Sequence, residues 1–154
     1  MKKLIKILPA FCLLTACVSP FTAILDADSK FIEQNLPASN ANYGSIPKNY
    51  QEQIKKYMEQ VLKDPDSAKY SDFTRLDKSY AVYKKNNMQV MTHNDVYYGY
   101  SICFWVNAKN SYGAYVGKTP YLAFFHNQKV MDIKEVQPLL NAAYLGSKFV
   151  ACPK

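Results

Sequence analysis

The residues on which most small catalytic and metal-binding sites depend are scarce in this 154-residue sequence, which has two histidines, five glycines and four cysteines. His93 and His126 lie far apart in the chain, and neither has a Cys or His neighbour at the spacing of a zinc site. With so few glycines there is no glycine-rich loop to hold a phosphate, and no serine lies in a nucleophile elbow. The sequence therefore predicts no metal and no cofactor, and we expect a protein that is not an enzyme.

A short apolar run follows a basic start at the N-terminus. Three lysines precede the apolar residues 7–14. Such a run is too short to cross a bilayer as a helix, which takes about 20 residues. It has the length of the hydrophobic region of a secretory signal peptide, which precedes small residues at a cleavage site. Here Thr15 and Ala16 are the small residues, and Cys17 follows them directly.

The residues Leu14-Thr15-Ala16-Cys17 resemble the lipobox of bacterial lipoproteins. In that family the cysteine thiol receives a diacylglyceryl group and the chain is cut just before it. The resemblance implies that residues 1–16 are a signal peptide and that acylated Cys17 anchors the mature protein, because two or more acyl chains bind a membrane stably. No Asp follows Cys17, which resembles lipoproteins sorted to the outer membrane; in a Gram-positive host the same signal implies the cell-membrane surface. A plain signal peptide with a chance cysteine is the alternative.

Processing at this site would leave two cysteines for the folded part of the chain. Cys12 is lost with the signal peptide and Cys17 carries lipid, so Cys103 and Cys152 remain in a compartment that oxidises thiols. We predict a Cys103–Cys152 disulfide that ties the C-terminus to an aromatic-rich strand. Two buried free thiols are the alternative.

The basic balance of the full chain comes partly from the signal peptide. Without its three lysines the formal charge falls from +7 to about +4. The remaining basic residues are dispersed, and the pairs Lys55-Lys56 and Lys84-Lys85 are isolated. Nucleic-acid binding requires a clustered basic face, so we expect no nucleic-acid partner.

The rest of the chain divides into a tether and one domain. Residues 17–48 contain a linker-like cluster of Ser, Asn, Pro and Gly, and we expect a lipid-anchored, partly helical tether. Residues 49–154 predict a single α+β domain. Its first helix is expected over residues 49–64, where apolar residues recur at spacings of three and four, with Asn49 as its cap and Pro65 as its stop.

From residue 66 onward the pattern favours strands. In residues 97–106 the side chains alternate onto two occupied faces, which predicts a central strand covered on both sides, or one with a face closed by the disulfide and the C-terminus. Residues 107–113 are typical of a hairpin connection, and a final helix is expected over residues 134–146 with Gly146 as its stop. The predicted fold is an antiparallel sheet of four to five strands with a preceding amphipathic helix, a C-terminal helix and one disulfide. The expected strands are short apolar or aromatic runs: 71–75, 78–85, 88–93, 97–106, 115–116, 121–125 and 129–133.

Aromatic residues are dense in the second half of the chain, with ten of them in residues 97–125. Tyrosine combines a large apolar area with a polar tip, so it serves both half-buried sheet surfaces and binding faces. We expect core packing to take about half of these side chains. The residues that we predict for binding are Tyr112 and Tyr115 beside the hairpin, together with Trp105 and Asn110.

The segments LKDPDSAKYSDF and VNAKNSYGAYVG together are similar to a pattern in small bacterial envelope and prophage-associated proteins. The similarity covers residues 49–131 and implies no particular activity. Turn chemistry alone accounts for the residue types at 64–68 and 107–113.

The function expected from these features is that of a lipid-anchored envelope protein acting as a non-enzymatic binding or assembly module. Its partners would be the membrane, through acylated Cys17, and an envelope protein or glycan. The alternatives are an accessory lipoprotein subunit of a secretion or conjugation complex, and a phage-exclusion lipoprotein. A small envelope hydrolase is the least favoured, because it requires His126 or His93 in a cleft beside a carboxylate or hydroxyl.

Overall fold

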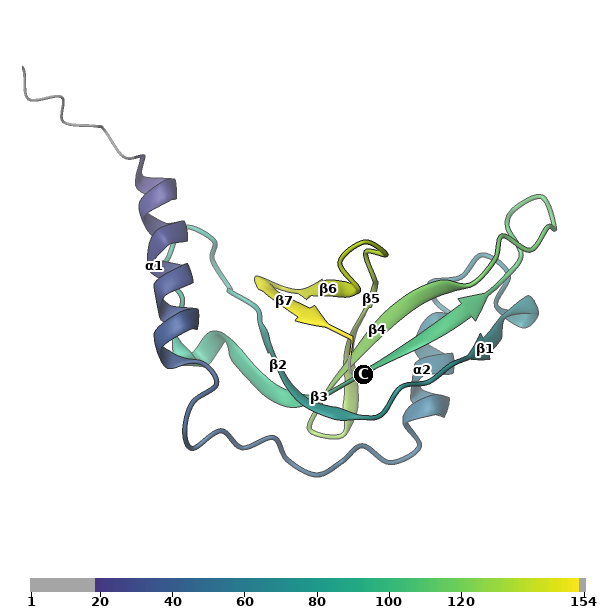
Figure 1. Ribbon diagram of the computed structural model, residues 1–154, viewed down its shortest axis with the longest axis horizontal. Coiled ribbons are helices and arrows are strands. Elements are labelled where there is room, and N and C mark those ends of the chain that lie inside the picture. The colour runs from purple at the N-terminus through teal and green to yellow at the C-terminus, as the bar shows by residue number, and fades with distance from the viewer. Residues whose placement is uncertain (1–18, 153–154) are drawn as a thin grey trace, which may run out of the picture.

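A five-stranded antiparallel sheet forms the centre of the computed structural model, which describes residues 19–152 of the chain (Figure 1). The sheet strands are β1 Lys69–Ser71, β2 Asp77–Val82, β3 Val96–Asn107, β4 Thr119–His126 and β5 Lys129–Glu135, and a separate hairpin comprises β6 Ala142–Leu145 and β7 Lys148–Ala151. Strand β4 pairs along one edge of β3 and β5 pairs with β4, while β1 and β2 share the other edge of β3. The predicted α+β class with an antiparallel sheet is therefore confirmed. The strand expected over residues 88–93 does not form; residues 115–116 contribute only an isolated bridge from Tyr115 to Lys109, and of residues 71–75 only Ser71 lies in a strand.

Both faces of β3 are buried, as its alternating pattern predicts. One face packs Ile102 and Phe104 against helix α2, Tyr50–Met58, whose Ile54 and Met58 are fully buried. The other face packs against the β6–β7 hairpin (Figure 1). The sheet is thus the middle layer of the domain. Its long central strand, β3, joins the β2–β3 connection at one end to the β3–β4 connection at the other.

Helix α2 is shorter than the helix expected over residues 49–64. Asn49 precedes it with a φ of 50°, and its side chain makes no capping hydrogen bond. After Met58 the chain continues in turns to a short 3-10 helix, Pro65–Ser67, where the Asp64 carboxylate accepts a hydrogen bond from the Ser67 N–H. Pro65 begins this second element, in agreement with the fixed φ of proline.

The C-terminal helix expected over residues 134–146 is wrong, because the structure has the end of β5, a turn and β6 there. Pro138 has no N–H to donate within a helix. Leu139 is fully exposed and Leu140 is more than half exposed, so these apolar residues do not form the buried stripe of a helix. Gly146 lies in the β6–β7 turn with a φ of 61°, and an added Cβ would lie 1.9 Å from the Val82 carbonyl oxygen.

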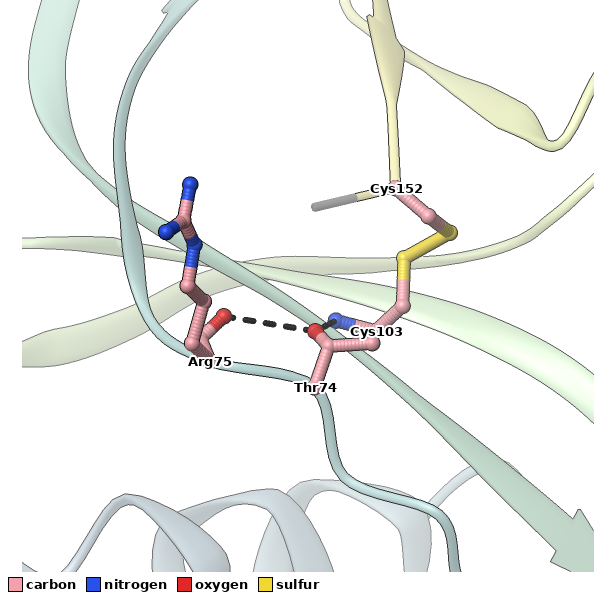
Figure 2. The surroundings of a disulfide bond; sticks show 4 residues. All are labelled: Thr74, Arg75, Cys103 and Cys152. Atoms are coloured by element: carbon pink, nitrogen blue, oxygen red, sulfur yellow. Dashed lines mark hydrogen bonds between the residues drawn. A yellow bond between two sulfur atoms is a disulfide. The ribbon is translucent and has the colours of Figure 1, made fainter. Parts of the chain in front are cut away.

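The Cys103–Cys152 disulfide is present and joins β3 to the end of β7 (Figure 2). Both cysteines are buried in the core cluster on the hairpin side of the sheet. The backbone around Cys103 is held by Thr74, which lies between β1 and β2. The Thr74 N–H donates to the Cys103 carbonyl at 2.9 Å, and the Thr74 hydroxyl accepts from the Cys103 N–H at 3.0 Å. A side-chain oxygen thus takes the place of a backbone acceptor where the edge strand is interrupted.

Helix α1, Pro20–Asn35, begins at the Ser19 cap and lies at one end of the sheet (Figure 1). Its buried Asp28 forms an ion pair with Lys84 and accepts a hydrogen bond of 2.7 Å from the Met91 N–H, so α1 is tied to the β2–β3 connection. Farther along, the Ala38 N–H donates to the Tyr98 hydroxyl. The segment expected as a tether therefore has contacts with the domain. Within residues 19–152, no helix has the length and apolarity needed to span a bilayer; Cys17 lies outside the described residues.

Candidate functional site

The connection between β3 and β4 forms an ordered hairpin tip, which we define as residues 107–117. Asn110 organises it: its side-chain oxygen accepts from the N–H groups of Tyr112 and Ala114, and its own N–H donates to the Ala114 carbonyl. Gly113 supplies the positive φ of 79° that the turn requires. The side-chain oxygen of Asn110, predicted as a binding residue, thus serves to shape the hairpin.

Tyr112 is the most exposed aromatic side chain of the hairpin tip, at 94% of its full accessible area. The tip lies at the opposite end of the molecule from α1 along its longest axis (Figure 1). The exposure expected from the sequence is therefore observed for Tyr112. A rigid aromatic ring in this position is the kind of side chain that contributes strongly to protein interfaces.

Tyr115 lies between two lysine side chains. The Lys69 and Lys109 ammonium groups are 4.6 Å and 5.7 Å from the centre of its ring, and its hydroxyl donates to the Ser67 carbonyl. Both contacts are cation–π interactions by distance. The ring is 42% exposed, so the expected exposure is also observed here, on a surface that carries positive charge.

Trp105 does not join this surface. It is partly buried against the core cluster that contains the disulfide. The structure thus brings together three of the four predicted binding residues, Asn110, Tyr112 and Tyr115, and packs Trp105 against the core cluster of the disulfide. Whether any of them binds a partner remains a prediction.

A groove of about 210 Å³ lies beside the hairpin tip, between β3, β4 and the residues after α2. Its walls include Val61 and Val116, which are 54% and 64% exposed, and two lysines, Lys63 and Lys109. The Lys63 ammonium donates to the Ser111 hydroxyl at 3.1 Å and so links the two walls. Sequence reasoning missed this groove because Val61 continues the apolar stripe of α2, which predicts burial.

The two histidines are engaged in structural contacts. The Nδ1–H of His126 donates to the Tyr98 carbonyl at 2.8 Å, and its Nε2 accepts from the Asn127 side-chain amide at 2.9 Å. Both ring nitrogens therefore have hydrogen-bond partners within the chain. His93 is exposed, and its ring packs edge-on against Phe31 at 5.0 Å.

The buried carboxylate of the sheet is also committed to other partners. Asp132 accepts a hydrogen bond from the Tyr83 hydroxyl at 2.5 Å and forms an ion pair with Lys134 at 3.2 Å. Burial, and then the hydrogen bond to Asp132, raise the pKa of the Tyr83 phenol. No cluster of three or more His, Cys, Asp or Glu side chains suited to a metal ion occurs in the described part of the chain.

No protein-family model matches the chain, and no curated protein or solved structure matches it.

Proposed function

We propose that this chain is a lipid-anchored envelope protein that acts as a non-enzymatic binding or assembly module, with the hairpin tip as its partner-binding surface. The observation that carries the proposal is the almost complete exposure of Tyr112 on a hairpin whose backbone is held by Asn110. An aromatic ring on a pre-ordered turn loses little conformational entropy on binding. The partner is another envelope component, a protein or a glycan.

The arrangement of the two ends of the molecule supports this proposal. Pro20, the first residue of α1, follows Cys17 closely in the sequence, and the hairpin tip lies at the far end of the long axis (Figure 1). Acylation of Cys17 would therefore hold α1 near the membrane and the tip away from it. The N-terminal part of α1 suits a place near the membrane, because Phe21 and Leu25 are about half exposed there.

The contacts of His126 and of Asp28 weigh against two of the alternatives, the hydrolase and the accessory subunit. Hydrolysis would require a histidine with an available ring nitrogen beside a carboxylate or hydroxyl, whereas both nitrogens of His126 have other partners. An accessory subunit that orders its N-terminal segment only on docking would leave that segment without internal contacts. Here Asp28 is held by Lys84 and by the Met91 N–H.

The proposal is tested by photo-crosslinking in intact cells, with a photoreactive amino acid at position 112. The matched control carries the same amino acid at position 129, an exposed site at the start of β5 and away from the hairpin tip. We expect a defined adduct from position 112 that the Cys17→Ser variant no longer forms, together with loss of lipid label in that variant. Equal adducts from both positions, or no dependence on Cys17, would contradict the proposal.

A further inference from the structure

We infer that the groove beside the hairpin tip binds an acidic segment of a partner protein, with carboxylates at Lys63 and Lys109 and an aliphatic side chain between Val61 and Val116. This inference rests on the proposed function and specifies the chemistry of the partner. It assigns to the groove a role that the aromatic residues alone do not indicate.

The groove is lined by positive charge. Lys63 and Lys109 line the groove, and Lys69 lies beside Tyr115 next to it; like most basic side chains of residues 19–152, none of the three has a carboxylate within 4.0 Å. The ammonium of Lys63 meets a neutral hydroxyl, and those of Lys69 and Lys109 face the Tyr115 ring. Three cations gathered around one hairpin without acidic partners attract an anionic group from outside the chain.

The groove also has apolar walls. Val61 and Val116 are each more than half exposed, and the floor between them is formed by core residues such as Val106. A groove of about 210 Å³ is smaller than the usual range for drug-sized ligands, which is about 300–1,000 Å³. It is suited to one anchoring side chain of a larger partner, which is how buried anchors at protein interfaces act.

The charge near Tyr121 sets the direction of the bound segment. Tyr121 also lines the groove, farther along β4 from the hairpin tip than Thr119, and it pairs with Glu135 across β4 and β5. Burial, and then the negative charge of Glu135, raise the pKa of the Tyr121 phenol. A carboxylate of the partner is therefore placed at the Lys63–Lys109 end, with the aliphatic group toward the centre.

The combination of charge and apolar surface favours a protein segment over other anionic partners. Phosphate polymers offer no aliphatic group for the space between Val61 and Val116. An anionic lipid of the anchoring membrane is also unsuitable, because the groove lies at the end of the molecule away from α1 (Figure 1). An acidic peptide with one or two aliphatic residues supplies both groups.

The test measures binding of fluorescein-labelled peptides to the purified, oxidised full chain by fluorescence anisotropy at low and high salt. The probes are the octapeptides EEELLEEE, EEEGGEEE and KKKLLKKK, and inorganic polyphosphate serves as a competitor. We expect the leucine-containing acidic peptide to bind about tenfold more tightly than the glycine version, with a loss of affinity at high salt. The basic peptide should not bind.

Three substitutions locate the site. Lys63→Gln and Lys109→Gln should each weaken binding of EEELLEEE about two- to fivefold, and Val116→Ser should remove the advantage of leucine over glycine. Lys129→Gln, at the start of β5, is the matched control and should leave peptide binding unchanged. Thermal unfolding of each variant shows whether the fold is retained.

Equal affinity for the leucine and glycine peptides, full displacement by polyphosphate with no leucine preference, or indifference to both lysine substitutions would each overturn the inference. An adduct at position 112 in cells without peptide binding would overturn this inference alone. Peptide binding without any adduct in cells would count against the proposed function instead.

Discussion

The buried ion pair between Asp28 and Lys84 gives a direct test of how α1 is held. Their side chains are 10% and 6% exposed, and Asp28 also accepts the Met91 N–H at 2.7 Å. Replacing Lys84 with Met removes the cation and leaves a carboxylate with little access to water. Breaking one partner of a buried pair costs about 3–5 kcal/mol, so we expect a loss of that size in the free energy of unfolding, measured by urea denaturation.

The chain contains a matched control for this change. Lys118 and Asp72 form an ion pair of 2.6 Å that is more than half exposed on both sides. An exposed pair is stabilised little by its mutual attraction, because water and salt screen both charges. Lys118→Met should therefore leave the free energy of unfolding nearly unchanged.

A second readout distinguishes undocking of α1 from global loss of stability. If Lys84→Met releases α1 alone, hydrogen exchange at the Met91 amide becomes faster while the amides of β3 stay protected. The double variant Asp28→Asn with Lys84→Met removes both charges and keeps an acceptor for the Met91 N–H, so it should recover most of the loss. Equal effects of the Lys84 and Lys118 substitutions, with unchanged exchange at Met91, would refute this account of the helix.

Three further predictions concern the sheet. Cys152→Ser removes the Cys103–Cys152 disulfide, which closes a loop with a sequence separation of 49 residues. On the chain-entropy model the free energy of unfolding should fall by about 4 kcal/mol. A reductant should destabilise the parent by the same amount and should not affect the variant. Gly99→Ala should prevent stable folding, because its Cβ would lie 1.8 Å from the Phe125 carbonyl oxygen, and a variant as stable as the parent by thermal unfolding would contradict this close approach. The pKa of Tyr83 is raised in the folded state. The contribution of Tyr83 to stability is therefore complete below the ordinary tyrosine pKa of 10.0 and is lost as pH rises above that value. In urea denaturation across this pH range, the stability of Tyr83→Phe should depend less on pH than that of the parent.

The central strand and the disulfide could be predicted from the sequence because each has a simple physical signature. Alternation along residues 97–106 has the period of two that a strand buried on both faces requires. The pairing of Cys103 with Cys152 followed from the count of remaining cysteines. The hairpin tip was predictable for a similar reason, because Asn110 and Gly113 are typical turn residues.

The C-terminal segment could not be predicted in this way. Its apolar residues have a helical spacing, yet Leu139 and Leu140 are exposed in a turn. Ala142, Ala143 and Leu145 belong to β6 and are buried where the β6–β7 hairpin packs on the sheet. Long-range pairing decides this outcome, since the Val136 N–H bonds the Pro120 carbonyl. Local spacing carries no information about that partner.

The groove and the docking of α1 were hidden for a different reason. Both depend on residues whose type suggests the opposite environment: Val61 is exposed and Asp28 is buried. Neither is recognisable until the fold brings Val116 beside Val61 and Lys84 beside Asp28. The exposure of the tyrosines at the candidate site could thus be predicted from the sequence, whereas the groove beside them could not.

The central claim is that the chain presents its hairpin tip to a partner while α1 stays near the membrane. Paired photo-crosslinking in intact cells tests it most directly, with the photoreactive amino acid at position 112 in one sample and at position 21 in the other. Both sites are exposed, and they lie at opposite ends of the molecule. The account predicts protein or glycan adducts from position 112 and lipid adducts from position 21. Lipid adducts from position 112, or the same adducts from both positions, would contradict it.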